Sequence, residues 1–225
     1  MLKFFGTNAS YYTYRDEMRY PNLIHLDWRW IDILGPKSCI QEKYTKPFDF
    51  EPEFPRFELD ADAIPADILN VHNLSEFLIV SKKFYNVIQS FNLGNYQVFE
   101  RDLITAQGNI LYYILYFPDC QDEQLIDWSK SRFLMEPRDG GKKYWAMPQN
   151  SEAYIALLPG TQLVWEEYLV TKMPPIGLDM FRLSAIRNFA CHYVSPALRQ
   201  ALEAEKMIGV NFLKETVLHL PDEGT

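Results

Sequence analysis

The chain has 225 residues, of which 48% are hydrophobic and 15% aromatic, and its formal net charge at pH 7 is −8. A chain of this length and apolar content can form one large domain with a sizeable core. The negative charge argues against non-specific binding to nucleic acid or to an anionic membrane. No apolar run long enough to span a membrane is present, and the start lacks the apolar stretch of a signal peptide, so we expect a cytoplasmic protein.

Residues 1–60 form an aromatic and acidic lead-in that we expect to be irregular in the main. Prolines at 47, 52 and 55 interrupt regular structure there, and only residues 23–26 and 57–59 have the apolar pattern of short strands. The next segment, residues 64–69, has a proline near its start and predicts a helical turn.

A strand, a helix and a hairpin are predicted next. Residues 77–80 form an apolar strand, and Ser81 is a good N-cap for the helix that follows. Apolar residues then recur at the spacing of one helical face: Phe84, Val87, Ile88 and Phe91. Gly94 can end this helix in a left-handed conformation. Residues 96–103 and 110–117 have the pattern of a β-hairpin.

The second half of the chain predicts further strands and a second helix. A turn is predicted at 139–142, and strands are predicted after Trp128 and over residues 154–158, 163–170 and 180–183. Ser195 as N-cap and Pro196 at the first helical position predict a helix to about residue 207. Gly209 and another strand follow it.

One pattern occurs twice, in residues 77–104 and 191–218. Val80-Ser81 aligns with Val194-Ser195, and one inserted residue then aligns Gly94 with Gly209. The chain lacks the regular strand–helix alternation of a doubly wound sheet. We therefore predict a single α+β domain over residues 1–225, with a mixed, mainly antiparallel sheet, two repeated strand–helix–strand units and a core over 61–225.

The sequence lacks the motifs of the common catalytic and cofactor sites. It contains no zinc-binding His-Glu-x-x-His, no Cys/His cluster, no phosphate-binding glycine loop and no Gly-x-Ser-x-Gly. Cys191 and His192 are neighbours on a predicted strand and should point to opposite faces, so they cannot act as nucleophile and base. Helix capping explains Ser81 and Ser195. We predict no catalytic, metal or cofactor-binding residues.

Acidic residues are concentrated in two stretches. Residues 49–67 contain seven acids and one base, and residues 119–127 contain a second group. Three interpretations are open: a solvated loop, a docking surface that attracts a basic protein, or paired carboxylates for glycoside or magnesium chemistry. Trp128, beside the second group, fits a core anchor better than an interface residue. The candidate partner-binding residues are Glu51, Glu53, Asp60, Asp62, Asp122 and Glu123.

Several short motifs occur in a defined order over roughly residues 60–215. They are an apolar residue followed by Ser at two strand-to-helix junctions, a central Asp-Trp segment with two serines, a late Phe-Arg-Leu and a Gly-containing end. They fall on Val80-Ser81, Asp127-Trp128-Ser129 with Ser131, Phe181-Arg182-Leu183, Val194-Ser195 and residues 209–212. Their order and spacing resemble a family of immunity proteins from bacterial polymorphic-toxin systems, immunity family eleven, which was formerly a domain of unknown function.

The resemblance implies a non-enzymatic protein that binds and neutralises a cognate toxin. The cytoplasmic expectation then implies a toxin that acts in the cytoplasm, for which a nuclease with a basic active face is one fitting class. The resemblance assigns no contact residues. The alternatives are an uncharacterised enzyme that uses paired carboxylates and a general protein-interaction scaffold.

Overall fold

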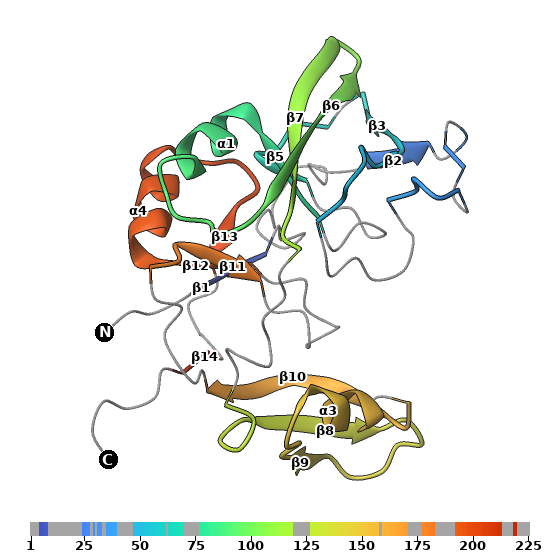
Figure 1. Cartoon of the computed structure of the whole chain (residues 1–225), viewed down its shortest axis with the longest axis vertical. Coiled ribbons are helices and arrows are strands. Elements are labelled where there is room, and N and C mark those ends of the chain that lie inside the picture. Colours follow the sequence, from blue (N-terminus) through green and yellow to red (C-terminus); the bar gives the residue numbers. More distant parts are fainter. Residues whose placement is uncertain are drawn as a thin grey trace.

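The structure is a computed structural model of the chain. The structure describes residues 5–8, 24–27, 29, 31–32, 35–39, 47–61, 63–69, 77–118, 127–157, 159–170, 177–182, 192–212 and 218–219. Its helices and strands form three sheets in which most strand pairs are antiparallel, which confirms the predicted α+β class (Figure 1).

A six-stranded sheet has the order β2-β3-β6-β7-β5-β4. All of its pairs are antiparallel except β3 with β6. The predicted hairpin is confirmed as β6 and β7, which are joined by a two-residue turn because Thr105 pairs with Gly108. The strands are β2 (Ile24–Asp27), β3 (Arg56–Leu59), β4 (Ile68–Leu69), β5 (Phe77–Ser81), β6 (Gln97–Thr105) and β7 (Gly108–Tyr116).

A four-stranded sheet has the order β11-β12-β1-β13 and is antiparallel throughout. Its strands are β1 (Phe5–Asn8), β11 (Met180–Arg182), β12 (His192–Val194) and β13 (Asn211–Phe212). The strand β1 lies between β12 and β13, with Phe5 opposite Val194 and Thr7 opposite Phe212. The lead-in, expected to be irregular, thus supplies a central strand of this sheet.

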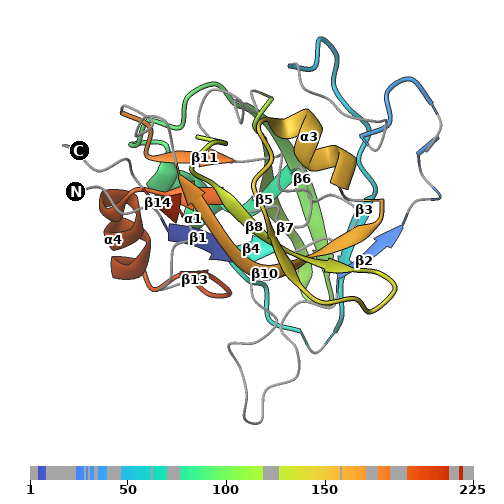
Figure 2. The ribbon, with the colours of Figure 1, turned by 90° about the horizontal axis from the view of Figure 1, so that it is seen from below.

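A second four-stranded sheet lies at the lower end of the molecule in Figure 1 and has the order β14-β10-β8-β9. In the view from below, β8 and β10 lie in front of the six-stranded sheet (Figure 2). The helix α3 (Ser151–Leu157) packs on this sheet through buried Tyr154, whose ring centre is 4.6 Å from that of Phe133. The strands are β8 (Arg132–Pro137), β9 (Tyr144–Ala146), β10 (Thr161–Val170) and β14 (Leu218–His219).

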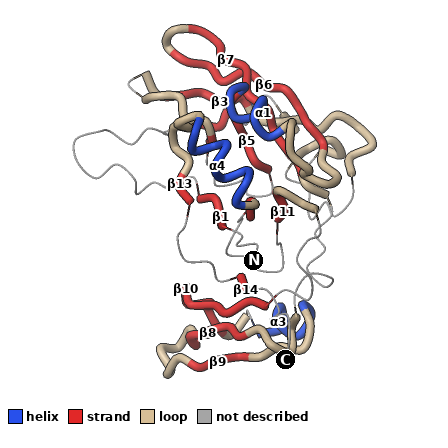
Figure 3. The backbone as a smooth tube through the Cα atoms, turned by 90° about the vertical axis from the view of Figure 1, so that its left-hand side faces the viewer, coloured by secondary structure: helices blue, strands red, loops and turns tan. Residues whose placement is uncertain are grey.

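The helices α1 (Lys82–Ile88) and α4 (Pro196–Ala204) lie side by side (Figures 1 and 3). Both begin as the sequence predicts. The Ser81 Oγ accepts the Phe84 N–H at 3.1 Å, and the Ser195 Oγ accepts the Leu198 N–H at 3.2 Å. α1 ends at Ile88, before Gly94, and α4 ends at Ala204. Gly94 and Gly209 still have positive φ angles, of 67° and 76°, in the turns that follow the helices.

The two faces of the six-stranded sheet cover two cores. One face packs against Cys39 and residues 48–54, and Phe48 and Phe54 contact Phe77 of β5 there. The other face carries α1 and α4, and both repeats contribute equivalent residues to this core. The equivalent pairs are Ile68 with Met180, Val80 with Val194, Phe84 with Leu198 and Ile88 with Leu202, all of them at most 2% exposed.

The sequence repeat corresponds to two similar structural units. The first unit, residues 67–116, arranges its strands as β4-β5-β7-β6, and the second, residues 179–212 with β1, arranges them as β11-β12-β1-β13. In each unit the third strand pairs antiparallel with its two neighbours. In the first unit β7 follows β6 directly, whereas in the second unit β1, from the other end of the chain, takes the same position.

An aspartate in each unit joins the two units. Asp67 accepts hydrogen bonds from the Ser81 hydroxyl and, at 2.7 Å, from the Ile208 N–H, while its own N–H donates to the Ile208 carbonyl at 2.7 Å. The Asp67 carbonyl accepts the Ser81 N–H at 2.9 Å. Ile208 belongs to the turn after α4, so the aspartate of the first unit binds the second. We call this set of four bonds the Asp67 clasp.

The second unit repeats the arrangement as the Asp179 clasp. Asp179 accepts bonds from the Ser195 hydroxyl at 2.7 Å and from the Asn92 N–H at 3.0 Å. Its N–H donates to the Asn92 carbonyl at 2.7 Å, and its carbonyl accepts the Ser195 N–H at 2.7 Å. Asn92 lies in the turn after α1. The two units therefore exchange equivalent contacts, as expected for a pseudo-two-fold relation.

Two predicted elements are wrong. Residues 64–69 contain the strand β4, not a helical turn, because Ile68 and Leu69 are buried and pair with Val80 and Ile79 of β5. Residues 154–158 were expected to be a strand, yet α3 covers most of them. Asn150 starts this helix, since its Oδ1 accepts the Ala153 N–H at 2.7 Å.

Candidate protein-binding site

Glu51 and Glu53 project from an extended segment that crosses one face of the six-stranded sheet. The segment is held by its backbone, because the Glu53 N–H donates to the Lys37 carbonyl at 2.8 Å and its carbonyl accepts the Cys39 N–H at 3.1 Å. Side chains alternate along an extended chain, so Pro52 and Phe54 are buried while Glu51 and Glu53 are exposed. The alternation of proline or phenylalanine with glutamate thus produces an acidic outer row.

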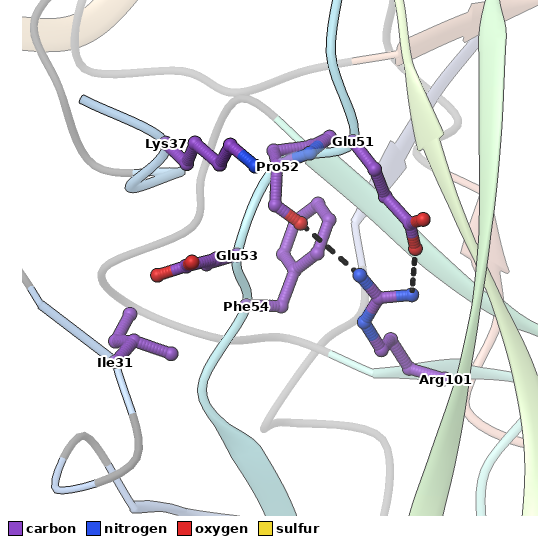
Figure 4. A pocket seen from close by; sticks show the side chains of 7 residues that line it. All are labelled: Ile31, Lys37, Glu51, Pro52, Glu53, Phe54 and Arg101. Atoms are coloured by element: carbon purple, nitrogen blue, oxygen red, sulfur yellow. Dashed lines mark hydrogen bonds and ion pairs between the residues drawn. The ribbon is translucent and has the colours of Figure 1, made fainter. Parts of the chain in front are cut away.

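Arg101 of β6 fixes the position of Glu51. Its Nη1 lies 3.1 Å from the Glu51 Oε1, its Nη2 donates to the Pro52 carbonyl at 3.1 Å, and its guanidinium lies 5.1 Å from the centre of the Phe54 ring (Figure 4). The Glu51 side chain is 72% exposed and that of Arg101 27% exposed, so solvent screens the pair and its contribution to stability is small. Its main effect is to orient a carboxylate toward the surface.

These residues border an open hollow of about 370 Å³, which we call the Arg101 hollow. Its lining is formed by Ile31, Lys37, Glu51, Pro52, Glu53, Phe54 and Arg101 (Figure 4). The lining contains two acids and two bases, so its charges balance. Such a surface can form ion pairs of both signs with a partner, but it does not carry the uniformly negative character that the acidic stretch predicts from sequence.

The other acidic candidates lie elsewhere or outside the described residues. Asp60 is half-buried at the end of β3 and does not line the Arg101 hollow. Asp62, Asp122 and Glu123 fall outside the part of the chain that the structure describes. Asp67, counted in the acidic stretch, is only 7% exposed and belongs to the Asp67 clasp, so it is a structural residue.

The Asp127-Trp128-Ser129 segment forms a turn before β8. The Ser129 hydroxyl donates to the Asp127 carboxylate at 2.6 Å, and the Ser131 hydroxyl donates to the Asp127 carbonyl at 2.7 Å. The hydrogen bond from Ser129, and then the nearby Lys130 ammonium, hold the pKa of Asp127 below its ordinary value. Trp128 is 2% exposed and packs near Phe133, which confirms the predicted core role.

Cys39 and His192 are both buried among packed side chains in the part of the chain that the structure describes. Cys39 is 3% exposed, and burial raises the pKa of its thiol to about 12, which disfavours the reactive thiolate. His192 is buried with its ring centre 5.3 Å from that of Phe117. Within the described residues no group of three or more His, Cys, Asp or Glu side chains could hold a metal ion, and no helix could span a membrane.

Sequence reasoning missed the two bases and a cluster of exposed apolar residues. Lys37 and Arg101 are distant in sequence from the acidic stretch, and only the pairing of β3 with β6 and of Ser38 with Glu53 brings them to it. The strand β9 presents exposed Tyr144 and Trp145. These two adjacent aromatic residues, between the Gly-Gly turn and Pro148, are the signal that could have predicted a short strand there.

Neither the protein-family models nor the curated proteins contain a match to this chain.

Proposed function

We propose that the chain is an immunity protein, which binds a toxin that acts in the cytoplasm and blocks the toxin's active site or another essential surface. The observation that carries the proposal is the position, within the fold, of two of the motifs that resemble immunity family eleven. Val80-Ser81 and Val194-Ser195 occupy equivalent junctions, each beside an Asp clasp. Two of the motifs that carry the resemblance are therefore equivalent helix starts of the two units.

The charges of the described surface are compatible with a binding role. The carboxylates of the Arg101 hollow are matched by Lys37 and Arg101, and Glu51 is held in an ion pair. A paired-carboxylate enzyme would instead need two acids directed at one enclosed substrate. An open surface with fixed, exposed charges suits the rim of a protein interface, where charges govern orientation and association rate.

The proposal is tested by co-expression with the toxic domain of the adjacent reading frame. That domain is expressed in a susceptible host, with and without this chain. We expect growth arrest that the chain relieves, and a one-to-one complex on co-purification. A toxic neighbour that this chain neither binds nor neutralises would overturn the proposal.

The Arg101 hollow can be tested in the same complex. If the hollow contacts a basic toxin, Glu51→Lys with Glu53→Lys should lower the association rate at least tenfold at low salt and flatten its salt dependence. The charge reversal Glu152→Lys, at an exposed position of α3, is the control for each of the two single reversals. Unchanged kinetics in the first variant would remove the hollow from the interface while leaving the immunity proposal intact.

A further inference from the structure

The strand β9 carries a cluster of exposed apolar side chains. Six large apolar side chains are exposed among the described residues, and three of them lie within residues 144–147: Tyr144 at 41%, Trp145 at 51% and Met147 at 57%. The other three, Ile64, Ile110 and Ile208, come from three different segments. Single exposed apolar residues are normal on a protein surface, whereas a cluster that contains Trp, Tyr and Met is typical of an interface.

The register of β9 with β8 places part of the cluster on one face. Trp145 pairs with Leu134, and Ala146 pairs with Phe133. Ala146 and Phe133 are buried, and Phe133 contacts Tyr154 of α3, so their face is the core face. Residues alternate along strands, and Trp145 with Leu134 therefore lies on the opposite face. Met147 follows the end of β9 directly and is also exposed.

β9 is also an edge strand. It ends the order β14-β10-β8-β9, so no described strand pairs with its outer side. In Figures 1 and 3, β9 is the strand of this sheet that lies farthest from the six-stranded sheet. An edge strand presents backbone N–H and C=O groups that can pair with another extended chain.

The sequence segment that contains β9 is basic although the whole chain is acidic. Residues 130–150 contain five bases and two acids, against the formal net charge of −8 for the chain. Lys142 and Lys143 are exposed immediately before β9. A segment paired along this edge would therefore gain from acidic side chains near the two lysines and from apolar side chains near Trp145.

We propose that β9 receives an acidic, extended segment of another protein as an added strand. Backbone pairing would hold the segment, contact with Trp145 and Met147 would bury its apolar side chains, and Lys142 with Lys143 would select its acidic residues. A second copy of this chain fits less well, because pairing two such edges would gather four lysines in one ribbon. This inference is independent of the immunity proposal.

The test uses the full chain and a random decapeptide library displayed on phage. We expect enriched peptides in which acidic and apolar residues alternate. For a synthetic enriched peptide, Lys142→Glu with Lys143→Glu, and separately Trp145→Ala, should each raise Kd at least tenfold. The controls Lys82→Glu and Ile64→Ala also replace exposed residues, and they should leave Kd unchanged. N-methylation of every second peptide amide should also weaken binding at least tenfold in one of the two alternate registers, since it removes the strand hydrogen bonds to β9.

Several results would overturn the proposal. The library could yield no enriched peptide, or only peptides without acidic residues. A synthetic enriched peptide could also bind the β9 variants as tightly as the wild type, or keep its affinity whichever of the two alternate registers is N-methylated. A wild-type dimer in sedimentation that Trp145→Ala dissociates would show that a second copy occupies β9 instead. Circular dichroism should show that every variant is folded, because the replaced side chains are exposed.

Discussion

The two units of the core reach the same arrangement by different paths of the chain. The first unit is continuous, and β7 follows β6 through a two-residue turn. The second unit takes its matching strand, β1, from residues 5–8, far from β13 in sequence. The strand order and the clasps are nevertheless equivalent. The shared geometry therefore depends on where Asp, Ser and the strand pairs lie, and not on an uninterrupted segment.

The largest losses of stability are expected from truncating the buried helix residues of the two units. Phe84 of α1 and Leu198 of α4 occupy equivalent positions and are both fully buried. We expect Phe84→Ala to lower the free energy of unfolding by about 4 kcal/mol and Leu198→Ala by about 3 kcal/mol, since each leaves a cavity. Urea unfolding measures both. Similar losses of less than about 1 kcal/mol would contradict a shared, tightly packed core.

Removing β1 tests whether the second unit needs the distant strand. Deletion of residues 1–8 removes the register pairs of β1 with β12 and β13. At about 1 kcal/mol for each backbone hydrogen bond, we expect a loss on the order of 3 kcal/mol. Hydrogen exchange should show faster exchange in β12 and β13 while β5 and β7 change less. Equal acceleration in both units would mean that they unfold as one.

The clasps are tested by replacing each aspartate with its amide. Asp67→Asn and Asp179→Asn keep the side-chain shape but remove one oxygen acceptor and the negative charge. We expect a loss of about 2 kcal/mol for each variant, and the larger loss for Asp67, which is more buried. The control Asp102→Asn changes an exposed residue of β6 and should be nearly neutral. Thermal unfolding of the three variants distinguishes these outcomes.

Local signals predicted much of the fold. The N-caps Ser81 and Ser195, the hairpin of β6 and β7 and the strand β11 follow from capping and alternation, which act over a few residues. The strand β4 was missed because its two residues are extended only through pairing with β5. β1 was missed for the same reason, since its partners β12 and β13 lie near the other end of the chain.

The candidate site was less predictable than the fold. The sequence indicated that Glu51 and Glu53 are exposed acids, but nothing in their neighbourhood predicted Arg101 or Lys37 beside them. The count of acids also included Asp67, whose carboxylate is used inside the core. Charge is read from single residues, whereas a surface potential depends on which distant residues the sheets bring together.

The smallest expected effect concerns a contact that the pseudo-two-fold relation does not repeat. Lys83 of α1 donates its ammonium to the carbonyl of Glu205, just after α4, while the equivalent position in α4 is Ala197. A cation at a helix C-terminus is stabilising, but Lys83 is exposed, so we expect Lys83→Met to cost about 0.5 kcal/mol. The neighbouring Lys82→Met should cost less. The loss should shrink at high salt in urea unfolding, because salt screens exposed charges. A salt-independent loss would assign the effect to packing of the lysine stem instead.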